Sequence, residues 1–104
     1  SGSSFATNVL VAPGDLEIVA GTDTLGTFES RPGKLRQFCT RCGSPVYNRM
    51  ADGSGLLPVR AGTLDADPGM RPSRHIWVRS KAPWIELADD LPKHVEGFDS
   101  PVTD

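Results

Sequence analysis

The two cysteines of this chain are the residues whose type and spacing point most directly to chemistry. Cys39 and Cys42 stand in the segment FCTRCGSPVY, as a C-x-x-C pair followed at once by Gly43. Two thiolates three positions apart can reach one metal ion where the chain between them turns sharply, and a glycine permits the positive φ that such a turn needs. A structural zinc site has four protein ligands. The pair therefore predicts half of a zinc knuckle, with Cys39 and Cys42 as structural metal ligands.

Three other interpretations of the pair stay open. A thioredoxin-like redox motif would lie between a strand and a helix, whereas residues 45–50 favour a strand that begins at Pro45. Free cysteines are also common as inert core residues. A complete zinc site would be formed if His75 and His94 joined the two cysteines, although His75 falls in a predicted strand and His94 in a polar tail.

Short segments of alternating polarity, separated by glycine and proline turns, surround the pair. Eleven glycines and nine prolines divide the chain, and helical periodicity is almost absent. These patterns predict an all-β fold of six or seven short antiparallel strands with little helix. The expected strands are residues 5–12, 16–20, 25–30, 35–38, 45–50, 56–62 and 75–79. Pro58 cannot donate a backbone hydrogen bond, so its strand is expected at a sheet edge or with a bulge.

Length and composition limit the class of protein. The 104 residues suffice for one domain with a modest core. No apolar run approaches the roughly 18 residues of a membrane span and no signal peptide is recognisable, so no membrane partner is expected. Two closely spaced cysteines are not the framework of a disulfide-rich secreted protein, which favours a reducing, cytoplasmic location. Tyr47, Trp77 and Trp84 are expected to pack within the sheets rather than to stack on bases.

The charges are unevenly distributed, although the net charge is −2. Residues 31–81 contain ten basic residues against three acidic ones, whereas the first 30 and the last 23 residues are acidic. Such a middle segment can bind an anionic small molecule or a nucleic-acid backbone. A solvated sheet face, balanced by the acidic ends, is the simpler interpretation, and a nucleic-acid partner is not the primary expectation. Arg60, Arg74 and Arg79 are the candidates to contact an anionic ligand.

Four segments together resemble a known family: GSSFATNVLV, RQFCTRCGSPVY, VRAGTLD and HIWVRSKAPW. They occur in the order and at the spacing of the glutathione-dependent formaldehyde-activating enzyme family, whose relatives include centromere protein V. The resemblance extends from Gly2 to about Leu91. It implies a zinc β-fold of two antiparallel sheets packed like a tent. It also implies a carbon–sulfur lyase that reversibly joins formaldehyde to the glutathione thiol, with zinc as cofactor and glutathione as co-substrate.

The resemblance also assigns the cysteines. Cys39 and Cys42 match the later C-x-x-C of the family's structural zinc site. The family takes the other two ligands of that site from an N-terminal C-x-C and holds its catalytic zinc with a C-x-C-x-x-C, and neither motif occurs in these 104 residues. Residues 1–92 are therefore expected to form an N-terminally incomplete family domain, followed by a polar tail at 93–104. Lyase activity is expected to be impaired or absent, and no catalytic residue is assigned.

Two kinds of partner follow from this comparison. The family implies a small thiol adduct as the ligand. An open sheet edge, or a zinc ion shared between two Cys39–Cys42 pairs, would support a homodimer. Two alternatives to a lyase remain: a zinc-knuckle module that binds nucleic acid through the basic middle segment, and a folded remnant that binds no metal.

Overall fold

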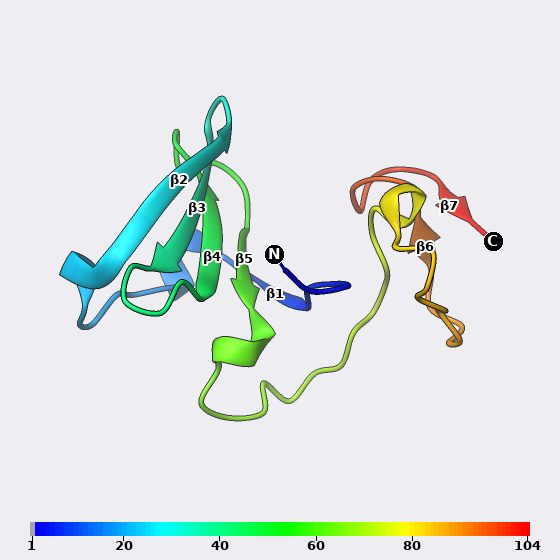
Figure 1. The fold of residues 1–104 in the computed structure, drawn as a ribbon, viewed down its shortest axis with the longest axis horizontal. Coiled ribbons are helices and arrows are strands. Elements are labelled where there is room, and N and C mark those ends of the chain that lie inside the picture. Colours follow the sequence, from blue (N-terminus) through cyan, green and yellow to red (C-terminus); the bar gives the residue numbers. More distant parts are fainter. Residues whose placement is uncertain (1) are drawn as a thin grey trace. The chain divides into compact units, whose positions relative to one another are not determined.

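The computed structural model describes residues 2–104 and contains seven strands in two antiparallel sheets (Figure 1). The predicted all-β fold class is confirmed, because the helical segments between residues 2 and 104 are 3-10 turns of three residues each. The chain divides into two compact units. Residues 7–66 are called the sheet unit below, and residues 2–6 with 67–104 the loop unit. Among the described residues, no helix is long and apolar enough to cross a membrane.

The sheet unit contains a five-stranded sheet in the spatial order β1-β5-β4-β3-β2, in which all neighbouring strands are antiparallel (Figure 1). Its strands are β1 (Asn8–Val11), β2 (Leu25–Arg31), β3 (Lys34–Cys39), β4 (Pro45–Met50) and β5 (Leu57–Arg60). Four of the predicted strands therefore match β2 to β5 closely, and the predicted strand at 5–12 is shorter. The strand predicted at 16–20 is wrong, because that stretch pairs with no neighbour.

The sequence predicts Pro58 at a sheet edge or at a bulge, whereas it lies in an internal strand whose register with β1 is continuous. β5 is placed between β1 and β4, and Pro58 is opposite Leu10 of β1. The ladder between β5 and β4 is limited to the pair Tyr47 and Val59. A residue without a backbone N–H is tolerated in this internal strand because the pairing beside it is so short.

The core of the sheet unit lies on one side of the sheet. Tyr47, Leu57 and Val59 are buried there, and four half-buried apolar side chains pack against them: Val11, Leu16, Leu25 and Val46. Packing of Tyr47 in the sheet is thus confirmed. The same expectation is wrong for Trp77 and Trp84, which are 51% and 75% exposed.

A buried amide completes the core side of β3. Gln37 is 5% exposed, and its side-chain nitrogen donates to the Gly26 carbonyl at 3.3 Å. Its Oε1 accepts from Thr27 Oγ1 at 3.1 Å and from Arg49 Nε at 3.3 Å. A buried polar group without partners would destabilise the fold, so these three bonds let Gln37 link β2, β3 and β4.

Gly26 is expected to tolerate no side chain. A Cβ built there would lie 2.7 Å from Phe38 Cζ and 2.8 Å from Thr40 Cγ2. Thr40 cannot move away freely, since its hydroxyl donates to the Thr24 carbonyl at 2.9 Å. Gly26→Ala should therefore lower the free energy of unfolding by about 1–3 kcal/mol, as overpacking does. Urea denaturation checks this, with Gly62→Ala as the control: its Cβ would meet nothing within 4 Å, and equal losses in both variants would contradict the account.

The loop unit contains a second, short antiparallel sheet. β6 (Lys93–His94) and β7 (Val102–Thr103) form its two-stranded sheet, and His94 is 7% exposed. The His94 ring Nδ1 lies 2.8 Å from the Ser100 carbonyl oxygen. Local hydrogen bonds close this polar segment into a hairpin. The predicted domain boundary between residues 92 and 93 stays a prediction.

The strand predicted at 75–79 is also wrong. His75 makes an isolated parallel bridge to Lys93. Trp77 then adopts a left-handed backbone, with φ 60° and ψ 33°, and Val78–Ser80 form a 3-10 turn. Left-handed φ is costly for a side chain as large as tryptophan. Backbone bonds hold it, since the Trp77 N–H donates to the Glu96 carbonyl at 2.7 Å.

Candidate functional site

The two cysteines lie on the turn that joins β3 to β4. The backbone N–H of Cys39 donates to the Ser44 carbonyl at 2.9 Å, and its carbonyl accepts from the Gly43 N–H at 2.7 Å. Gly43 has a φ of +80°, which reverses the chain directly after Cys42. The strand β4 begins two residues later. The turn between two strands that the pattern predicts is therefore present, and no helix follows the pair as a thioredoxin-like motif requires.

The environment of the two thiols favours the thiolate form of one of them. Cys39 is half-buried and Cys42 is exposed, so the interpretation as inert core residues is wrong for Cys42. Cys42 Sγ lies 3.2 Å from Ser44 Oγ. Hydrogen bonding with the Ser44 hydroxyl, then with the Ser44 backbone and the Cys39 thiol, lowers the pKa of the Cys42 thiol. Because thiolates are the metal-binding form, the pair fits two of the four ligands of a structural zinc site.

The structure does not add further ligands to the pair. Between residues 2 and 104, no group of three or more His, Cys, Asp or Glu side chains is placed to hold a metal ion. Both histidines have other partners: His94 faces the Ser100 carbonyl, and His75 faces a carboxylate. The four-ligand site that would combine both cysteines with both histidines gains no support from these contacts.

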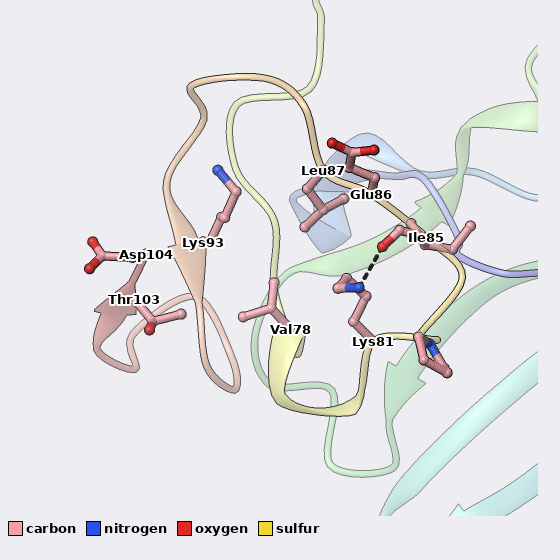
Figure 2. A pocket seen from close by; sticks show the side chains of 9 residues that line it. Val78, Lys81, Ile85, Glu86, Leu87, Lys93, Thr103 and Asp104 are labelled. Atoms are coloured by element: carbon pink, nitrogen blue, oxygen red, sulfur yellow. Dashed lines mark hydrogen bonds between the residues drawn. The ribbon is translucent and has the colours of Figure 1, made fainter.

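The loop unit contains a groove of about 500 Å³ with mixed walls (Figure 2). Figure 2 shows the Lys81 ammonium turned toward the Ile85 carbonyl, to which it donates a hydrogen bond. Lys93, Thr103 and Asp104 lie together on the side formed by β6 and β7. Apolar side chains supply much of the remaining wall, and the lining residues are Val78, Lys81, Pro83, Ile85, Glu86, Leu87, Lys93, Thr103 and Asp104.

A second, smaller cavity of about 260 Å³ in the same unit shares Lys81 and three apolar residues with the groove. His75 and Trp77, the residue with the left-handed backbone, also line this cavity. His75 Nε2 lies 3.0 and 2.9 Å from the two carboxylate oxygens of Asp89. A histidine held by a carboxylate in this way has its ring orientation fixed. Strained backbone at a cavity wall is a frequent property of functional sites.

Asp89 is expected to make stability depend on acid pH. The bond with His75, then that with the Leu91 N–H, and to a lesser extent the charges of His75 and Lys93, lower the pKa of Asp89 below its ordinary 3.8. A carboxyl group whose pKa is lowered by folding stabilises the fold at pH values above its pKa in the unfolded state. This stabilisation is lost as the pH falls through its pKa in the folded state. Between pH about 5 and about 2, thermal unfolding of wild type should therefore lose more stability than that of Asp89→Asn. Parallel pH profiles of the two proteins would contradict this.

Two of the three arginines considered for an anionic ligand already have partners within the protein. Arg79 Nη1 lies 2.6 Å from Glu96 Oε1, and Arg74 donates to the Phe98 carbonyl at 3.5 Å. Both belong to the loop unit, whereas Arg60 is on β5 of the sheet unit. The sequence interpretation also missed Ser44 and the His75–Asp89 pair. Ser44 could have been found from the sequence, because it stands two positions after Cys42. The His75–Asp89 pair has no such local signal, because its two residues are 14 positions apart.

These observations define a small β protein with a two-thiol turn in one unit and a ligand-sized groove in the other. The family model for the glutathione-dependent formaldehyde-activating enzyme matches residues 1–80. The chain therefore belongs to that family, which the resemblance in its motifs predicts, and its function at the family level is glutathione-related formaldehyde activation. The match includes the cysteine turn and the residues from His75 to Val78 of the cavity wall. No curated protein and no solved structure matches the chain significantly.

Proposed function

We propose that this chain binds the glutathione adduct of formaldehyde and supplies the fold, but not the catalytic metal ligands, for its carbon–sulfur chemistry. The observation that supports the proposal most strongly is the family match over residues 1–80. In the reaction, the thiol sulfur of glutathione bonds to the formaldehyde carbon, the thiol loses its proton, and the carbonyl oxygen becomes a hydroxyl. Reversal breaks the same carbon–sulfur bond, and no oxidant or reductant is needed.

The groove and the cavity of the loop unit have the chemistry that such a ligand needs. Glutathione has two carboxylates, and Lys81 and Lys93 are the cations of the groove wall. The Lys93 ammonium donates to the Asp89 and Leu91 carbonyls at 3.2 and 3.3 Å, which keeps it in place for a ligand. Apolar residues that line both spaces, such as Val78 and Leu87, exclude water from the short adduct.

Cys39 and Cys42 would hold a zinc ion as two of its four ligands, and that ion would fix the turn between β3 and β4. The remaining two thiolates would come from outside this copy of residues 1–104, and a second copy offers a matching pair. A site of four cysteines is closed to substrate, so it stabilises and does not catalyse. Since these 104 residues contain no other cysteine, we expect the chain alone to have impaired or no lyase activity.

Magnetization exchange in ¹³C NMR tests the proposal. Labelled formaldehyde and glutathione are mixed with the zinc-loaded protein. The rate of exchange between formaldehyde hydrate and the glutathione adduct is then compared with the rate measured without protein. We expect no acceleration, together with ligand-induced shifts of loop-unit amides. Lys81→Met should weaken the shifts, whereas Arg71→Met, which removes an exposed cation bound to Asp67, should not. An exchange rate raised to catalytic values would contradict the expected loss of lyase activity. An absence of adduct binding would contradict the glutathione adduct as the ligand.

A further inference from the structure

Four basic residues share one side of the five-stranded sheet, opposite the core. In β3, Lys34 and Arg36 alternate with the core-facing Gln37, so they point to the other side. Arg31 is paired with Lys34, and Arg60 follows the buried Val59 in β5. We call this set, together with Phe28, the basic face: Phe28, Arg31, Lys34, Arg36 and Arg60.

No acidic side chain of the sheet balances these charges. Glu29 is the only acid in the five strands, all of which are described; it is paired with Leu35 and therefore lies on the core side. The ion pairs in the described part of the chain involve Arg71, His75 and Arg79, and none of the four cations of the basic face. Such a concentration of like charge on one sheet face favours an anionic partner.

The cations also act on one another. Burial, then the charges of Arg36 and Arg31, lower the pKa of Lys34. Burial and then the charge of Arg36 lower the pKa of Arg60. Arg36 is therefore close enough to both to repel them, so the three strands β2, β3 and β5 contribute to one continuous cluster. A bound anion would relieve this repulsion.

An exposed aromatic ring lies within the cluster. Phe28 is paired with Arg36 across β2 and β3, and its side chain is 60% exposed. The exposed Phe28 ring places apolar surface in water, and a base stacked on the ring would cover that surface. Base–aromatic stacking does not depend on the nucleotide sequence. Cations around an exposed aromatic ring on an antiparallel sheet are typical of single-strand binding surfaces.

We propose that the basic face binds single-stranded nucleic acid, with phosphates on Arg31, Lys34, Arg36 and Arg60 and an unpaired base on Phe28. The cations give the charge complementarity, and Phe28 selects single strands because duplex bases are already stacked. This function is separate from the glutathione chemistry, which we assign to the loop unit.

Fluorescence anisotropy with a labelled oligothymidylate of about twelve nucleotides tests the proposal on the full chain. Four phosphate contacts predict that log K falls against log salt concentration with a slope of about −3 between about 20 and about 200 mM salt. The double variant Arg31→Gln/Arg36→Gln changes two exposed residues and should reduce that slope by about half. Arg71→Gln/Arg74→Gln removes the same charge from exposed residues of the loop unit and should leave the slope unchanged.

Phe28 variants separate stacking from simple charge attraction. Phe28→Ala should weaken binding of the oligothymidylate roughly fivefold or more, and Phe28→Trp should restore it. A duplex of equal length should bind more weakly, and Phe28→Ala should not affect it. The proposal is overturned by a wild-type protein that ignores the oligothymidylate at low salt, by equal slopes in the two double variants, or by a Phe28→Ala variant that binds as wild type.

Discussion

Replacing Cys42 by serine is expected to weaken zinc binding by this protein severely. A serine hydroxyl stays protonated at neutral pH and does not replace a thiolate, so one of the two ligands from each chain is lost. We expect the zinc affinity to fall by roughly a hundredfold or more. Even the mutation of a residue that only orients a metal ligand typically lowers metal affinity about 10- to 100-fold. Competition with a chromophoric chelator measures this loss.

Ser44→Ala is the matched variant, because it keeps both thiols and removes the hydroxyl beside Cys42. The Ser44 hydroxyl is the largest cause of the lowered pKa of the Cys42 thiol. Its removal should raise that pKa, so zinc binding should weaken at pH about 6 and recover at pH about 8, where thiolate forms more readily. An unchanged zinc affinity in Cys42→Ser would show that the cysteine turn is not a metal site.

Replacing Tyr47 by alanine is expected to unfold the sheet unit. Tyr47 is one of three buried apolar residues of a small core, and it pairs with Gln37 of β3 and Val59 of β5. Truncation of a buried aromatic costs about 3–5 kcal/mol, which is comparable to the whole stability of a small domain. Far-ultraviolet circular dichroism and urea denaturation at 25 °C should therefore show a largely unfolded chain.

Two controls identify burial as the cause. Tyr47→Phe keeps the ring and should cost little, because the ring supplies the buried apolar surface. Phe28→Ala removes a ring of similar size from the opposite side of the same sheet, where it is 60% exposed, and should change stability by less than about 1 kcal/mol. If Tyr47→Ala retained a cooperative transition near that of wild type, the core would lie elsewhere.

The sequence predicts best those parts of the structure that are determined by residues close together in the chain. The C-x-x-C-G spacing predicted the turn between β3 and β4, because a sharp turn and a residue at positive φ are encoded by neighbouring residues. Alternation of apolar and polar residues similarly predicted residues 45–50 as a strand, and β4 has these bounds. The buried Gln37 was not predicted, since its partners come from two other strands, β2 and β4.

The loop unit was predicted less well, because contacts distant in sequence determine it. Alternation in residues 75–79 is real, but the Trp77 N–H binds the Glu96 carbonyl and the chain turns at Trp77. The polar composition of 93–104 gave no sign that His94 would be buried against Ser100. The basic face is an intermediate case: its charges are visible in the sequence, whereas their position opposite the core follows only from the register of β2, β3 and β5.

Native mass spectrometry of the reduced, zinc-loaded protein tests most directly whether Cys39 and Cys42 are half of a shared zinc site. The account predicts a dimer with one zinc ion, which dissociates to metal-free monomers when a chelator is added and does not form in Cys42→Ser. A metal-free monomer at saturating zinc, or a monomer that holds one zinc ion by itself, would contradict it.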